Sequence, residues 1–177
     1  MTWCLVGSEM CIRDRNNSDG IIVLTGSIRC LFGSLFNKGL LNEIEEILTN
    51  LKEKFENNIY IEIQRHNDLN EKDFENYNLK VSEKLELPII ASHEVYYLDK
   101  DMFEAHDALM CIGEKTYLND TKRNKLSDQH YFKSSEEMIK LFKDLPEALE
   151  NNFNIPYRCS FKPNQSKPIL PRISTSE

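Results

Sequence analysis

Apolar and polar positions follow a regular order along the first half of the chain. Three short apolar runs predict strands at 20–24, which is expected to be a buried parallel strand, at 59–63 and at 87–91. Between them, apolar residues recur at helical spacing over 38–55 and 71–85, with charged residues on the other face. This order is typical of parallel strands joined by right-handed crossovers. The pattern therefore predicts an α/β fold, as a layer or a barrel.

Both helices carry capping signals and a defined apolar stripe. Asn37 precedes the first helix, and Asn70 precedes the second with Asp73 three residues later, as in a capping box. The residues expected to be buried are Leu40, Leu41, Ile44, Ile47, Leu48, Leu51 and Phe55 in the first helix, and Phe74, Tyr77, Val81 and Leu85 in the second.

After Tyr97 the pattern changes from alternating elements to helices and loops. Asp99 is expected to cap a helix, and a polar loop rich in Asn, Asp, Lys and Arg follows over 113–129. Residues 130–132 are a short strand candidate. The stripe of the predicted helix consists of Met102, Phe103, His106, Leu109 and Met110.

The last third of the chain predicts two further helices and an extended tail. Ser134 and Glu137 form a capping box for a helix through Phe142. The segment 144–147 begins another helix, because its proline is compatible with a first turn. Three prolines in 161–177 predict an extended linker.

The overall composition narrows the classes of function that the protein can have. There are 22 Lys and Arg against 29 Asp and Glu, for a formal charge of -7, and an acidic surface repels a phosphate backbone. No run of about eighteen apolar residues is present, so no membrane partner is expected. The cysteines form no CxxC pair, which argues against a disulfide framework or zinc ribbon and favours a reduced, cytoplasmic setting. They are Cys4, Cys11, Cys30, Cys111 and Cys159.

The first fifteen residues, MTWCLVGSEMCIRDR, fit neither a signal peptide nor a helix. A basic leading region is missing and the apolar stretch is too short. The string GSEMCIRDR resembles the translated sequencing-adapter scar found at the ends of environmental gene assemblies. We therefore interpret 1–15 as non-native sequence, exclude it from the fold, and expect the protein to continue upstream.

Several segments match, in order and spacing, the motifs of one known protein family. The segment 60–66, YIEIQRH, is similar to the family's E-[LI]-Q-x-H, and 87–98, LPIIASHEVYYL, is similar to its A-[TS]-N-D-V-H-Y. EAHDALMCI at 104–112 resembles A-H-x-x-L-x-C-I. YFKSSEEM at 131–138, PEAL at 146–149 and KPILP at 167–171 resemble later family segments. Together these segments resemble the PHP (polymerase and histidinol phosphatase) domain of bacterial DNA polymerase III alpha subunits.

The resemblance implies a specific place in a larger enzyme. Residues 16–160 would be the rear part of the PHP domain, a partial (β/α)7 barrel of parallel strands truncated at its front. The following helices would lead to 161–177, a linker toward the polymerase palm. The parent would carry out template-directed DNA synthesis with Mg²⁺, contacting DNA, a proofreading exonuclease subunit and a sliding clamp. The fragment alone is predicted to be inactive and without a cofactor.

The resemblance also identifies positions of a degenerate metal site. Family members with a working PHP site gather His, Asp, Glu and Cys ligands at the strand ends and support a metal-dependent 3'-5' exonuclease. Here Ser27 replaces a cysteine, and Glu94 and Tyr96 replace an aspartate and a histidine. With His66 these residues are the predicted degenerate positions. His66, His93 and Glu94 are weak candidate metal ligands, and a vestigial site is an open alternative.

Each residue that could take part in chemistry also has a purely structural interpretation. His66 could equally be a loop histidine bonded to backbone, and His93 is expected to be neutral and hydrogen-bonded. His106 is expected to be a core histidine, Cys111 a small buried apolar residue, and Glu62 a residue of the barrel interior or rim.

Two other functions stay open at this stage. A metal-dependent PHP exonuclease or phosphoesterase requires at least three ligand side chains to converge. A non-catalytic α/β binding module predicts a closed fold without an open sheet edge.

Overall fold

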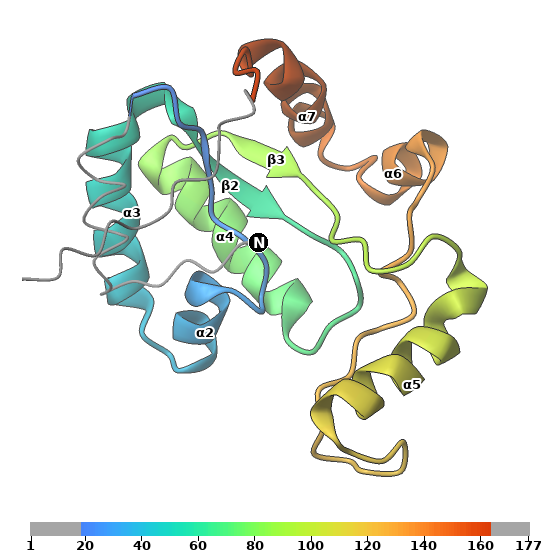
Figure 1. The fold of residues 1–177 in the computed structure, drawn as a ribbon. Coiled ribbons are helices and arrows are strands. Elements are labelled where there is room, and N and C mark those ends of the chain that lie inside the picture. Colours follow the sequence, from blue (N-terminus) through green and yellow to red (C-terminus); the bar gives the residue numbers. More distant parts are fainter. Residues whose placement is uncertain (1–18, 164–177) are drawn as a thin grey trace, which may run out of the picture.

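A three-stranded parallel sheet forms the centre of the structure, a computed structural model that describes residues 19–163 (Figure 1). The strands β1 (Val23–Leu24), β2 (Ile59–Ile63) and β3 (Ile89–Ala91) lie in the order β1-β2-β3. Both pairings are parallel, as predicted. The predicted scar over 1–15, and the part of the predicted linker beyond 163, lie outside the described residues.

Two long helices cover the sheet as predicted. These are α3 (Leu41–Phe55), which the short η1 (Glu56–Asn58) follows, and α4 (Glu71–Leu85). Because side chains alternate along a strand, one face of β2 packs with these helices and the other face carries Tyr60 and Glu62. All five residues of β2 are buried, so both of its faces are covered. The shared core includes Ile44, Leu48, Phe55, Phe74 and Val81 from the helices, and Ile59, Ile61, Ile63 and Ala91 from the strands.

The first strand is shorter and less buried than predicted. It has two residues instead of five, and Ile21 and Leu24 are 38% and 40% exposed. Among the described residues β1 pairs with β2 alone, so it is an edge strand with an uncovered side. An edge strand lacks the second neighbour that would bury such a run.

A short helix, α2 (Leu31–Asn37), occupies a segment for which the sequence predicted no element. Asn37 is its last residue, so the predicted cap of the next helix is wrong. Gly39 then adopts a φ of +75°, which ends helical geometry, and α3 begins at Leu41 instead of Lys38. As a result Leu40 and Leu41, which were expected in the core, are 37% and 39% exposed.

The predicted capping box at the start of α4 is also wrong. Asn70 lies in the left-handed region with a φ of +62°, and its side chain caps no N–H. Its amide instead donates to Oδ1 of Asn37 at 3.0 Å. A capping residue ordinarily has an extended backbone, and the left-handed conformation of Asn70 departs from it.

Beyond β3 the chain forms η2 (Lys100–Met102) and α5 (Phe103–Glu114), followed by the predicted loop. The predicted cap at Asp99 is wrong, since its side chain accepts no bond from the helix. Cys111 is buried, as expected. His106 is half-buried with its ring near those of Tyr96 and Tyr97, so it lies outside the core in which it was expected.

The strand candidate at 130–132 reduces to one bridge between Tyr97 and Tyr131. The helix α6 (Ser135–Leu141) begins with the predicted capping box of Ser134 and Glu137. The last helix, α7 (Pro146–Arg158), starts with its proline in the first turn, as predicted.

Helix α7 covers the edge of the sheet opposite to β1 (Figure 1). Nδ2 of Asn151 donates to the carbonyl oxygen of Ile89 in β3 at 2.8 Å, while Ala148 and Phe142 are fully buried in the core. Within the described part of the chain the two sheet edges therefore differ, because a helix covers β3 and none covers β1. No helix in the described part of the chain is long and apolar enough to cross a membrane.

Candidate functional site

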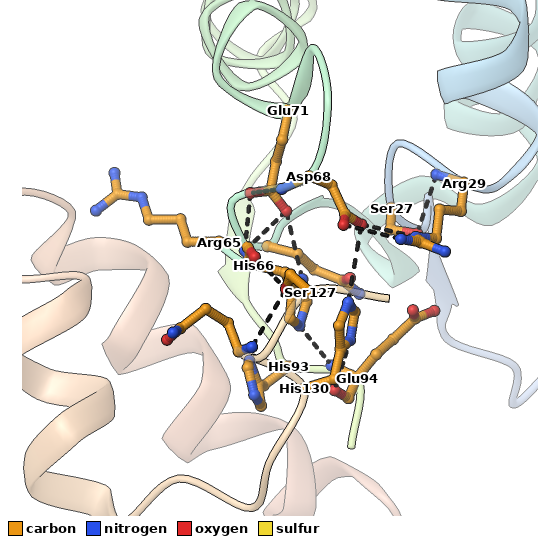
Figure 2. Close-up of polar contacts among 12 residues, drawn as sticks. Ser27, Arg29, Arg65, His66, Asp68, Glu71, His93, Glu94, Ser127 and His130 are labelled. Atoms are coloured by element: carbon orange, nitrogen blue, oxygen red, sulfur yellow. Dashed lines mark hydrogen bonds and ion pairs between the residues drawn. The ribbon is translucent and has the colours of Figure 1, made fainter. Parts of the chain in front are cut away.

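The carboxyl ends of parallel strands share one edge of the sheet, and polar residues gather there (Figure 2). We call this region the strand-end rim. It comprises 25–29 after β1, 64–68 after β2 and 92–96 after β3, together with 127–130 from the long loop.

Glu62 ties the three strand ends together. Its carboxylate accepts hydrogen bonds from the N–H of Gly26 at 2.9 Å, from Nε2 of Gln64 at 2.7 Å, and from Oγ of Ser92. Its own N–H donates to Oγ1 of Thr25 at 3.0 Å. Glu62 is buried, and a buried carboxylate with several donors is stabilised in place. This residue therefore fixes the spacing of the strands from inside the sheet.

His66 is fully buried, and both of its ring nitrogens have partners. Its backbone N–H donates to both oxygens of Glu71, and Nδ1 lies 3.3 Å from Oε1 of the same carboxylate. Nε2 accepts the backbone N–H of Glu94 at 3.2 Å. These bonds require the neutral tautomer with its proton on Nδ1. The His66 ring is thus hydrogen-bonded to the backbone of the loop that follows β3.

Three imidazole rings stack at the rim. The ring of His66 lies 4.4 Å from that of His93 and 4.0 Å from that of His130. Nε2 of His93 donates to the carbonyl of Tyr131 at 3.0 Å, and Nδ1 of His130 donates to the carbonyl of Glu94 at 3.2 Å. Burial, followed by the adjacent His66, lowers the pKa of His93 to about 4. His93 is therefore neutral and hydrogen-bonded near neutral pH, as the sequence suggested.

Arg29 and Asp68 form a two-bond ion pair that sequence reasoning did not identify. Nε and Nη2 of Arg29 donate to the two carboxylate oxygens of Asp68 at 2.7 and 2.8 Å. Nε2 of His130 lies 3.8 Å from Oδ2 of Asp68. Burial alone would raise the pKa of Asp68, but its hydrogen bonds with Arg29 and the nearby His130 ring outweigh burial and hold the pKa well below its usual range.

The structure brings the predicted site positions to the same rim, in different roles. Glu94 contacts His66 and His130 through its backbone, while no hydrogen bond to its carboxylate is found among residues 19–163. Tyr96 is 49% exposed and its ring meets the edge of His130 at 5.4 Å. Ser27 is buried at the end of β1, where its Oγ accepts the N–H of Arg29 at 3.3 Å.

His130, Asp68 and Arg29 are charged or titratable rim residues that the sequence did not flag. His130 was assigned to a strand, and Asp68 and Arg29 follow strands without any motif around them. The small number of histidines was a signal that could have pointed to His130. The chain has 4 histidines, and three of them stack at the rim.

As arranged, the described residues do not fit a catalytic metal. No group of three or more His, Cys, Asp or Glu side chains within 19–163 is placed to hold a metal ion. The lone pair on Nε2 of His66 is used by the N–H of Glu94, and Asp68 is paired with Arg29. Among the candidate ligands, Nδ1 of His93 and the carboxylate of Glu94 keep free lone pairs, and two donors hold a divalent ion weakly.

No family model matches the chain. Curated relatives match two thirds or more of it, and each of those described below is named DNA polymerase III subunit alpha. The protein of Caulobacter vibrioides is 33% identical over 161 residues, and that of Rickettsia bellii is 34% identical over 163. These matches cover 91% and 92% of this chain. The protein of Rickettsia prowazekii is 42% identical over 119 residues, 67% of this chain and 10% of the relative.

The chain spans 14% of the length of the first two relatives, so it corresponds to one segment of a much longer protein. Identity at this level along nine tenths of the chain indicates that the chain and the matching segment of these relatives share a common ancestor. The chain belongs to the family of DNA polymerase III alpha subunits.

Proposed function

We propose that the chain is a segment of a replicative DNA polymerase, and that its α/β unit serves that enzyme as a scaffold instead of a catalytic centre. The observation that carries the proposal is the identity of 33% to 34% with alpha subunits along about nine tenths of the chain. The parent enzyme would extend a primer on a DNA template with Mg²⁺ at carboxylates outside this segment. In the cytoplasm it would assemble with a proofreading exonuclease subunit and a sliding clamp.

The segment would be the rear part of a PHP domain with a (β/α)7 barrel. Support comes from the parallel order of β1, β2 and β3, since successive strands of a barrel add in one direction. The exposed apolar residues Ile21, just before β1, and Leu24, on β1, lie at the edge where earlier strands would pair. The covered edge of β3 fits the end of such a barrel.

The scaffold role follows from how the rim uses its polar groups. Glu62, His66 and Asp68 are each engaged by groups of the chain itself. A metal-dependent nuclease needs open donors and an open position for water on the metal. The nuclease alternative is therefore disfavoured. Among residues 19–163, β1 pairs with β2 alone, which likewise disfavours a self-contained binding module.

The proposal can be tested with a chimera. Residues 16–163 of this chain replace the matching segment in the Caulobacter vibrioides alpha subunit. Primer extension by the chimera should stay within about tenfold of the unmodified subunit, whereas deletion of the segment should abolish it. A soluble, folded chimera without primer extension would contradict the proposal.

A matched pair of glycine variants controls for the scaffold role. Alanine at Gly33 would place its Cβ 2.0 Å from the carbonyl oxygen of Ile28, whereas alanine at Gly113 would meet nothing within 4 Å. In the chimera, Gly33→Ala should abolish primer extension and Gly113→Ala should preserve it. Equal activity of the two variants would show that the enzyme does not need this segment folded.

A further inference from the structure

Helix α5 presents a row of apolar side chains to solvent. Met102, just before the helix, is 46% exposed, and Leu109 and Ile112 are 65% and 75% exposed. Ala105, which lies between them in sequence, is exposed as well. Residues at this spacing share one face of a helix, and a helix of a globular protein ordinarily turns such a face toward the core. We call these four residues the α5 stripe.

The opposite face of α5 is held by a polar contact. Asp107 and Cys111 are buried on that face. Nη1 and Nη2 of Arg123, in the long loop, donate to the two carboxylate oxygens of Asp107 at 2.5 and 2.7 Å, and the two side chains are 4% and 11% exposed. Within residues 19–163 the apolar core contains no residue of α5, and Figure 1 shows the helix set apart from the sheet. An ion pair therefore orients the helix so that its apolar stripe faces outward.

The size of the α5 stripe favours an occupant that belongs to the same polypeptide. Apolar side chains that lie together on a surface mark a contact with another body. A stable complex between separate chains buries about 800 Å² on each partner, from roughly 20–30 residues, which four residues of one helix do not supply. A covalently attached body needs less contact, because attachment gives it an effective concentration of about millimolar. The chain spans 14% of the first two relatives, so most of their length could provide that body.

We propose that the α5 stripe docks in an apolar groove of the parent polymerase chain outside this segment, and that it joins the scaffold to the polymerase body. The side chains of the stripe would enter the groove as an amphipathic helix does, with one anchor on each turn. This inference rests on the proposed function and adds to it the surface through which the scaffold is attached.

The test is amide hydrogen exchange over 103–114 in the isolated chain and in the Caulobacter vibrioides chimera. Burying an exposed Leu or Ile side chain favours the docked state roughly tenfold or more. The amides of α5 should therefore exchange at least about tenfold more slowly in the chimera than in the isolated chain. Leu109→Gln and Ile112→Gln together should remove this protection, since glutamine preserves helix formation without the apolar contact. In the isolated chain, the same double substitution should change Tm by less than about 3 °C, because both side chains are already exposed.

Leu69→Gln is the matched control, because Leu69 is 86% exposed and lies outside α5. It should leave the protection of α5 in the chimera unchanged. If the isolated chain does not fold, the chimera and its double variant decide the question without it.

Four results would overturn the proposal. They are equal exchange of α5 in the isolated chain and in the folded chimera, protection that survives the double substitution, protection that appears only when a proofreading exonuclease subunit is added, and a dimer of the isolated chain that the double substitution dissociates. Primer extension is measured separately on the same chimera. A chimera that extends primers without protecting α5 would overturn this inference and leave the proposed function standing.

Discussion

Nε2 of His66 accepts the backbone N–H of Glu94 at 3.2 Å, which joins the end of β2 to the end of β3. The same ring is held from the other side by Glu71, whose Oε1 lies 3.3 Å from Nδ1. A ligand for Nε2 would therefore have to displace a hydrogen bond between two strand ends. An N–H left buried without a partner costs about 1–3 kcal/mol, which opposes any such displacement. Side chains of a type that can bind a metal elsewhere are used here to form hydrogen bonds with the backbone.

Arg65 should be the side chain whose loss most weakens the attachment of the C-terminal helices. It donates to Glu75 in α4 at 2.5 and 3.0 Å and to both oxygens of Asp144 at 2.7 Å. Its guanidinium also lies 4.8 Å from the centre of the Phe142 ring. Arg65→Ala should lower the free energy of unfolding by about 2–4 kcal/mol, measured by urea denaturation.

The exposed pair of Lys84 and Glu45 is the control for Arg65. Lys84 is 61% exposed, so Lys84→Ala should cost less than about 0.5 kcal/mol. Similar losses for the two variants would contradict the importance given to Arg65.

Gly33 should tolerate no side chain. An added Cβ would lie 2.0 Å from the carbonyl oxygen of Ile28, and a backbone atom cannot move aside cheaply. Gly33→Ala should therefore cost about 3 kcal/mol or more, or prevent folding. Gly113→Ala, inside α5, should instead stabilise by about 0.5–1 kcal/mol, because alanine favours a helix and space is open there. Thermal unfolding of both variants checks this, and a stable Gly33→Ala protein would contradict the packing described.

The capping box of α6 should contribute measurably to stability. The side chain of Ser134 accepts the N–H of Glu137, and the Glu137 carboxylate accepts the N–H of Ser134 at 2.8 Å. Ser134→Ala should cost about 1 kcal/mol in urea denaturation, while Ser134→Asp, which keeps an acceptor, should stay within about 0.5 kcal/mol of the unmodified chain. Equal losses for the two substitutions would mean that the cap contributes nothing.

His93 should make the protein less stable in mild acid. Its pKa falls from 6.5 to about 4 on folding, chiefly through burial. Between these values the unfolded chain binds a proton that the folded chain excludes, so the free energy of unfolding decreases as the pH falls from 6.5 toward 4. Above 6.5 the group has no effect. Asp68 does not interfere, because its lowered pKa affects stability only below 3.8.

The measurement for His93 is urea unfolding at about pH 7 and about pH 5. The unmodified chain should lose more stability between them than His93→Asn, which cannot take up that proton. An equal loss in both proteins would show that His93 does not titrate in this range.

The sequence predicted the elements whose periodicity is strong. The strand 59–63 was placed with its correct ends, and the buried residues Phe74 and Val81 of α4 were identified from their spacing. The short helix α2 was missed because seven residues around a glycine carry no clear period. Asn70 misled the prediction because its cap chemistry is common, and only the backbone reveals its left-handed conformation.

The sequence predicted where the rim lies, but it identified only some of the residues that interact there. Strand order places His66 and Glu94 at one edge, because the ends of parallel strands coincide there. Asp68 and His130 come together through the path of the long loop, which no local pattern encodes. The pairing of Arg29 with Asp68 depends on the same tertiary contact.

The most direct test of this account is calorimetric titration of the purified chain with Zn²⁺ and Mn²⁺, followed by a 3'-5' exonuclease assay in the same ions. The account predicts no tight binding and no nuclease activity. The Nε2 lone pair of His66 and the Asp68 carboxylate are already engaged, and no three His, Cys, Asp or Glu side chains among residues 19–163 are placed to hold an ion together. Zinc binding of micromolar affinity or better that is lost in Glu94→Ala, together with ion-dependent nuclease activity, would contradict it.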